Sequence, residues 1–101
     1  MKSLPLLAIL ATPIFAIDAK AANLKVECGH QAQLVSAITK ARLDGVRERD
    51  VSDHLLKGDI TWPERYNPAI TPIAGWVYQQ KMRDVRTKDL AAGWQELCLK
   101  Q

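Results

Sequence analysis

The stretch that decides the fold is residues 28–46, CGHQAQLVSAITKARLDGV. Its apolar residues recur every three or four positions, which is the spacing of one face of a helix. Gly45 follows the last of them and can adopt the left-handed backbone that ends a helix. We therefore predict a helix from about Lys25 to Asp44, with Cys28 on its apolar side.

Three further helices are predicted downstream. The second runs from about Glu48 to Lys57, where apolar residues are four apart. The third begins after Asn67-Pro68 or Thr71-Pro72, since either pair places a proline in a first helical turn behind a capping residue. The fourth begins at Thr87, as its cap, and ends near Leu99. Residues 83–86 are predicted to be a connection.

The N-terminus has the pattern of a secretory signal peptide at residues 1–21. Lys2 supplies the positive charge, Leu4–Ile17 the apolar core, and Ala19-Lys20-Ala21 the small residues of a cleavage site. Cleavage after Ala21 is the preferred interpretation, cleavage two residues earlier is the second, and an uncleaved anchor is the third. The pattern is typical of a bacterial protein that is periplasmic or secreted.

The chain has two cysteines, Cys28 and Cys98. In an oxidising compartment such a pair more often forms a disulfide than a metal or redox site. A bond closing so long a loop stabilises a domain by roughly 4 kcal/mol. Replacing either cysteine with serine is then expected to be equally damaging. A metal pair of Cys28 and His30 is the alternative, but it has only two ligands, and we predict no metal.

Residues 22–101 are thus predicted to form an all-α fold, a small four-helix domain closed by a single disulfide and preceded by a signal peptide. The net charge of the whole chain is +3. Loss of Lys2, Asp18 and Lys20 with the signal peptide lowers it by one, which is too weak to indicate nucleic acid or an anionic surface. Membrane association is expected only if the signal peptide is retained. The alternating charges of residues 47–50 are interpreted as a solvated face.

Two short motifs in the chain are similar to motifs of a known type of protein. Arg42-Leu43-Asp44-Gly45-Val46 forms a predicted corner, and Val77-Tyr78 lies in the predicted third helix. Together with the two cysteines, they resemble small exported two-cysteine helical proteins of proteobacteria, over most of residues 28–98. The chain is also faintly similar to acid-stress periplasmic chaperones and to exported toxin-immunity proteins. The resemblance implies a helical exported protein and assigns no functional residue.

Catalysis finds little support in the sequence. His30 and His54 lie in different predicted helices, and Asp53 is adjacent to His54, which points the two side chains apart on a helix. With both cysteines bonded, no obvious nucleophile remains. We therefore predict no enzyme and no cofactor. A pocket that joined either histidine to a carboxylate would revive the enzyme hypothesis.

The longest segment without a helical pattern is residues 59–67. It contains three residues of types that dominate binding hot spots, namely Trp62, Arg65 and Tyr66. We predict these three as partner-binding residues. The alternative is that Trp62 folds back as a lid on a small core. Trp76 and Trp94, by contrast, lie on or near predicted apolar stripes and are assigned to the core.

Export, small size and a bridged scaffold favour a non-enzymatic periplasmic protein-binding module of the inhibitor, immunity or regulatory type. The expected partner is a protein. One alternative is an acid-stress periplasmic chaperone that opens at low pH. Another is a membrane-tethered regulator that retains its signal segment.

Overall fold

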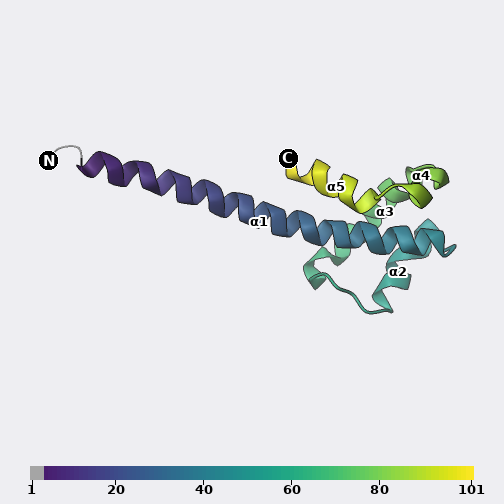
Figure 1. The fold of residues 1–101 in the computed structure, drawn as a ribbon. Coiled ribbons are helices and arrows are strands. Elements are labelled where there is room, and N and C mark those ends of the chain that lie inside the picture. Colours follow the sequence, from purple (N-terminus) through teal and green to yellow (C-terminus); the bar gives the residue numbers. More distant parts are fainter. Residues whose placement is uncertain (1–3) are drawn as a thin grey trace.

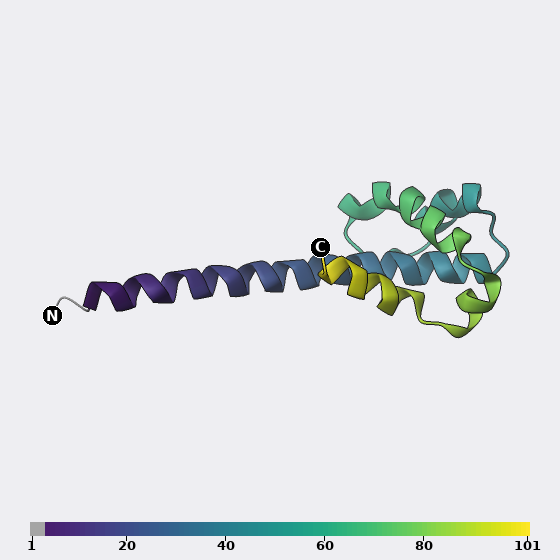
Figure 2. The ribbon, with the colours of Figure 1, turned by 90° about the horizontal axis from the view of Figure 1, so that it is seen from above.

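The computed structural model describes the backbone of residues 4–101 and the side chains of residues 21–101. Every regular element in that range is helical, as predicted. α5 runs back along α1, and α2 and α3 pack against the same long helix (Figures 1 and 2). The elements in order are α1 (Leu4–Leu43), the 3-10 helix η1 (Glu48–Asp50), α2 (Val51–Leu56), the 3-10 helix η2 (Glu64–Ala69), α3 (Ile70–Gln79), α4 (Met82–Thr87) and α5 (Leu90–Leu99).

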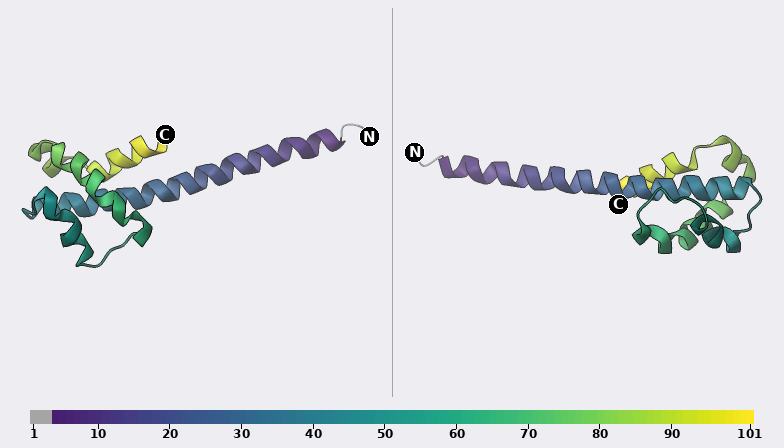
Figure 3. Two further views of the ribbon diagram at one scale, coloured as in Figure 1. Left: turned by 180° about the vertical axis from the view of Figure 1, so that it is seen from behind. Right: turned by 90° about the horizontal axis from the view of Figure 1, so that it is seen from below.

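α1 is one helix that covers most of the predicted signal peptide as well as the predicted first helix. It begins at Leu4 rather than near Lys25, and the alanine-rich junction at residues 19–22 favours this continuity. Its N-terminal part projects beyond the other helices (Figure 3). Residues 1–3 of the predicted signal peptide lie outside the described residues, and both the signal peptide and its cleavage stay predictions. Within the described chain, none of the helices combines the length and hydrophobicity needed to cross a membrane.

The core forms where α1 meets α2 and α3. Its largest side chains without exposed surface include Leu34 and Ile38 of α1, Val51 of α2, and Ile70 and Val77 of α3. A spacing of four residues on α1 and of seven on α3 places these side chains on one face of each helix. Each contributes roughly 1.5–3 kcal/mol by leaving water. This cluster is what the three helices fold around.

α1 ends at the predicted glycine. Gly45 has a φ of +87°, a conformation that costs glycine little because it has no Cβ. The Val46 amide donates to the Ala41 carbonyl at 3.0 Å, and the Gly45 amide donates to the Arg42 carbonyl at 3.1 Å. This pair of bonds is the Schellman pattern of a helix C-terminus. The predicted helix end is confirmed to within one residue.

The two motifs that carried the resemblance meet in space. The Arg42 guanidinium donates to the carbonyls of Val77 and Gln80, each at 2.7 Å. It also lies 5.3 Å from the centre of the Tyr78 ring, whose hydroxyl donates to the Val46 carbonyl. Arg42 therefore binds carbonyls at the end of α3, where the last helical carbonyls lack a full set of amide partners; the Val77 carbonyl also accepts from the Gln80 amide at 3.2 Å. The corner after α1 and the end of α3 form one structural joint.

The predicted four-helix count is wrong, because residues 83–86 belong to a helix. α4 buries Val85 in the core, with 3% of its surface exposed. Thr87 does not cap the last helix, since its hydroxyl donates back to the Arg83 carbonyl within α4. Asp89 caps α5 instead and accepts a bond from the Ala92 amide at 3.0 Å. The described residues thus contain five α-helices.

Two further boundaries differ from the prediction. The predicted second helix starts as η1, and α2 is only Val51–Leu56. The predicted irregular segment 59–67 is partly η2, which includes Pro68 and leads directly into α3. Pro72 falls in the first turn of α3, where its missing amide hydrogen leaves no helical bond unmade.

The predicted disulfide is confirmed. Cys28 of α1 and Cys98 of α5 are bonded, with their Cα atoms 5.7 Å apart. The bond joins the start of the packed part of α1 to the last turn of α5. It also removes the alternative metal pair of Cys28 and His30, because the Cys28 sulfur is already bonded.

Candidate partner-binding groove

The structure buries two of the three residues that the sequence predicted for binding. Trp62 has 6% of its surface exposed and Tyr66 has 9%, and both belong to the core cluster. The Trp62 indole donates to Asn67 at 2.9 Å. Arg65 is exposed, bonds Glu27 of α1 at 2.8 Å, and lies over the Tyr66 ring. The burial of Trp62 fits the core-lid alternative, and a binding role for the three stays a prediction.

The two histidines lie in different parts of the fold. His30 packs against the Tyr66 ring, with 5.4 Å between ring centres. His54 of α2 borders a surface cleft of about 290 Å³ that Asp44 and Asp59 also line. This cleft brings His54 near two carboxylates, which is the kind of pocket that would revive the enzyme hypothesis. Because none of the side-chain hydrogen bonds in residues 21–101 joins a histidine to a carboxylate, the absence of an enzyme activity stays a prediction. In the same part of the chain, no group of three metal-ligating side chains is found.

A larger groove lies beside the disulfide, between α1, α3 and α5. Its volume is about 600 Å³, within the range typical of ligand sites. We call it the tryptophan groove. Its lining consists of Leu24, Gln31, Trp76, Trp94, Leu97, Cys98 and Gln101. No side chain in this lining carries a charge.

Two partly buried tryptophans form one wall of the tryptophan groove. Trp76 of α3 and Trp94 of α5 pack edge to face, with ring centres 5.1 Å apart and planes at 68°. The Trp94 indole donates to the Gln31 side chain of α1 at 2.9 Å. That hydrogen bond and the ring contact fix the orientation of Trp94. Three helices therefore hold the aromatic wall in one arrangement.

The helix spacing explains why these residues share a face. Leu24 and Gln31 are seven apart on α1, which is nearly two full turns. On α5, Trp94, Leu97 and Cys98 are spaced by three and four residues and line the same side. The disulfide then brings the end of α5 against the start of the packed part of α1.

Exposed apolar side chains gather around the same end of the domain. Val26 is 55% exposed, Leu97 53% and Leu99 41%. Each lies within two residues of one of the bonded cysteines. Among residues 21–101, only Leu43 and Leu56 are large apolar side chains of comparable exposure elsewhere. Of these three side chains, Leu97 lines the tryptophan groove and adds exposed apolar surface to it.

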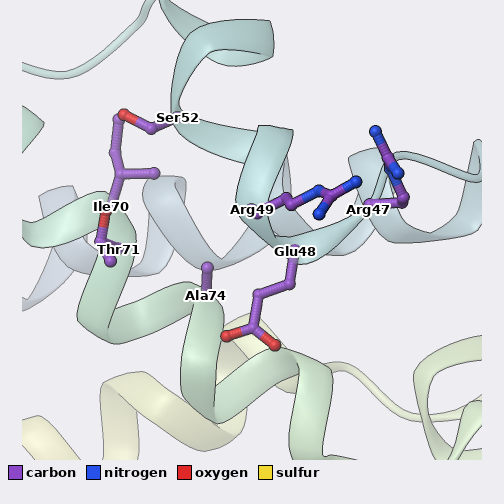
Figure 4. Close-up of a pocket in the computed structure, with 7 residues that line it drawn as sticks. All are labelled: Arg47, Glu48, Arg49, Ser52, Ile70, Thr71 and Ala74. Atoms are coloured by element: carbon purple, nitrogen blue, oxygen red, sulfur yellow. The ribbon is translucent and has the colours of Figure 1, made fainter.

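A second groove of similar volume, about 610 Å³, lies between η1 and α3 (Figure 4). Arg47 and Arg49 lie on one side of it, and Glu48 points toward α3. Arg47 bonds Asp50 at 3.0 Å, and both side chains are at least half exposed. Residues 47–49 are exposed, so this edge of the groove is a solvated charged face, as the sequence predicted. It is the weaker candidate, because exposed ion pairs contribute little.

Sequence reasoning missed the tryptophan groove. It placed Trp76 and Trp94 in the core, although both stay partly exposed. The available signal was the four-residue step from Trp94 to Cys98, which puts an aromatic ring beside the predicted bond. What could not be foreseen is that Leu24, Trp76 and Trp94 meet, because they come from three helices.

Comparison of the chain with protein-family models, with curated protein sequences and with solved structures gave no significant match.

Proposed function

We propose that the protein is a non-enzymatic, exported binding module whose contact centre is the tryptophan groove. The observation that carries the proposal is the Trp76–Trp94 pair in an uncharged groove, with the exposed Leu97 beside it. Tryptophan is among the residues most enriched in protein-binding hot spots. A rigid aromatic wall also costs little conformational entropy to order on binding.

The lining indicates what the partner presents. A charged partner side chain would lose its water in this groove without meeting an opposite charge, which is costly. An aliphatic side chain would bury apolar surface against Trp76, Trp94 and Leu97, which stabilises the complex by roughly 25 cal/mol per Å². We therefore propose a protein partner that inserts one or two aliphatic side chains from an uncharged segment.

The biological role follows from export. A small stable module that covers part of another protein is suited to inhibition, immunity or regulation, and we propose a role of this kind in the periplasm. The chaperone and the membrane-tethered regulator remain alternative predictions from the sequence.

The test is partner capture with matched surface variants. Leu97→Gln removes an exposed apolar side chain at the groove, and Leu56→Gln removes one of similar exposure on α2. Both should fold normally, because each side chain is about half exposed. A true partner should be captured by the native protein and by Leu56→Gln, and bind Leu97→Gln at least about tenfold more weakly, a change of roughly 1.4 kcal/mol.

Two results would contradict the proposal. One is a partner that binds Leu97→Gln as tightly as the native protein. The other is the absence of any stoichiometric partner from the exported fraction under several growth conditions.

A further inference from the structure

The tryptophan groove depends on α5. Four of its seven lining residues belong to α5 or follow it directly, namely Trp94, Leu97, Cys98 and Gln101. α1 and α3 supply the other three. If the C-terminal half of α5 left α1, the groove would lose most of its lining and the Trp76–Trp94 contact. What holds α5 in place therefore decides whether the groove exists.

A buried side chain anchors α5 at Leu90, whereas beyond it α5 is held by partly exposed contacts, chiefly those of Trp94 with Trp76 and Gln31, and by the bond at Cys98. Leu90 is the one buried residue of α5, with 8% of its surface exposed, whereas α3 has four buried residues, including Ile70 and Val77 with none. Trp94 is partly exposed and Leu97 is half exposed. An isolated helix of ten residues is unstable in water, and Gly93 weakens this one further. The covalent bond at Cys98 anchors the end that packing leaves weak.

We propose that oxidation assembles the groove, so that the protein has two states. With the Cys28–Cys98 bond intact, α5 lies on α1 and the groove is formed. With the two thiols free, the C-terminal half of α5 leaves α1, while the core of α1, α2 and α3 stays folded. The consequence for a partner rests on the proposed function, but the two structural states do not.

The chemistry of the change is thiol–disulfide exchange. Oxidation transfers two electrons and two protons from the thiols to an external disulfide, which is left as a dithiol. In the reverse direction, the thiolate of an external dithiol attacks a sulfur of the bond. Cys28 has no exposed surface, whereas Cys98 is partly exposed and lines the groove.

Because Cys98 is more exposed than Cys28, we expect an external thiolate to attack the Cys98 sulfur. The incoming thiolate reaches the Cys98 sulfur, forms a mixed disulfide there and expels the Cys28 thiolate, which takes up a proton. The second thiol of the reagent then attacks the mixed disulfide and releases Cys98. The groove is thus formed by the disulfide, and it also gives an external thiolate access to that disulfide.

The first test is hydrogen exchange on the full chain, oxidised and then reduced with dithiothreitol. On reduction we expect exchange at residues 90–101 to speed up at least about 30-fold more than exchange at residues 34–41 and 70–79, the signature of local opening. Exchange in the core also speeds up, because the bond contributes to the stability of the whole domain. The Cys28→Ala/Cys98→Ala double variant should reproduce the reduced pattern without reductant. Oxidised Leu97→Gln should keep native exchange, so a failure of partner binding stays distinguishable from a failure of this inference.

Two outcomes would overturn the proposal. Unchanged protection of residues 90–101 after reduction would show that α5 stays docked without the bond. Loss of protection in all helices together would show that the bond holds the whole domain rather than the groove.

A second test locates the point of attack. The folded protein is exposed briefly to glutathione, quenched with iodoacetamide and mapped by mass spectrometry. The glutathione adduct should be on Cys98 in at least about tenfold excess over Cys28, because access controls which sulfur reacts. Equal adducts on both cysteines, or an excess on Cys28, would contradict attack through the groove.

Discussion

The two ends of the domain are held together by different means. Around Ile38, the core closes by packing alone, with side chains from α1, α2 and α3 that have no exposed surface. Around Cys28 and Cys98, a covalent bond joins two helices whose neighbouring side chains, including Val26 and Leu97, stay half exposed. Apolar surface that the fold does not need for its own core is left available for a partner. The buried core thus stabilises the fold, whereas the exposed disulfide end is the part that we propose contacts a partner.

The largest loss of folding stability should come from replacing the cysteines, and the loss should differ between Cys28 and Cys98. Both Cys28→Ser and Cys98→Ser lose the cross-link, which contributes about 2–4 kcal/mol to the free energy of unfolding. Cys28→Ser also buries a hydroxyl where Cys28 has no exposed surface, at a further cost of about 1–3 kcal/mol. Urea denaturation of both variants measures the difference. Equal losses, as the sequence alone predicts, would show that burial of Cys28 does not matter.

Trp62→Ala should be nearly as damaging. Trp62 is buried in the core cluster and bonds Asn67, and removing a buried aromatic ring typically costs about 3–5 kcal/mol. Calorimetry gives the change in the free energy of unfolding, and a binding assay on the same variant gives the change in affinity. A variant that folds normally but binds a partner more weakly would restore the predicted binding role of residues 62–66.

Arg42→Gln should weaken the joint between α1 and α3. It leaves the Val77 and Gln80 carbonyls without the guanidinium, and bonds to charged groups contribute about 1.5–3 kcal/mol. Arg86→Gln changes an exposed arginine of α4 and serves as the control. Thermal unfolding should separate the two variants. Equal melting temperatures would mean that the joint contributes nothing.

Replacing Tyr78 should change folding stability least, and the change should depend on pH. Burial raises the pKa of Tyr78, and the nearby Arg42 lowers it in part. Because the folded pKa lies above the ordinary value of about 10, the stabilising contribution of the neutral phenol is complete below pH 10. It is lost as the pH rises through the folded pKa.

Tyr78→Phe should remove that pH-dependent loss. It should also cost about 0.5–1.5 kcal/mol at neutral pH, through the lost bond to Val46. Urea titrations of both proteins from pH 8 to pH 11 test this, and parallel pH profiles would contradict it.

Local signals in the sequence predicted a good part of the fold. The end of α1 was predictable because glycine at position 45 has a specific backbone role, and the disulfide because the chain holds only two cysteines. α4 was missed because Val85 is the one residue of that short helix that enters the core. Asp89, the cap of α5, is a favoured capping residue, but so is Thr87 two positions earlier, and the choice between them depends on where α4 ends.

The candidate site was less predictable than the fold. The sequence left open whether Trp62 is a binding residue or a lid on the core, because its segment lacks a helical pattern, and in the structure the side chain is buried. Trp76 and Trp94 looked internal because they lie on apolar stripes, yet the small domain leaves them at its edge. Whether a residue on an apolar stripe is buried depends on how far the neighbouring helices extend over it. In a domain of this size, that is decided by the packing of the helices and not by the local sequence.

The most direct test of how the two ends are stabilised is urea unfolding of the reduced Trp62→Phe variant. Unfolding is monitored by two signals. Without Trp62, fluorescence reports Trp76 and Trp94 at the disulfide end, and far-ultraviolet circular dichroism reports the helical core. We expect reduction alone to shift the tryptophan emission to that of a solvated indole, while the helical signal persists and is lost cooperatively only on adding urea. An unshifted emission without urea, or a single transition shared by both signals, would contradict it.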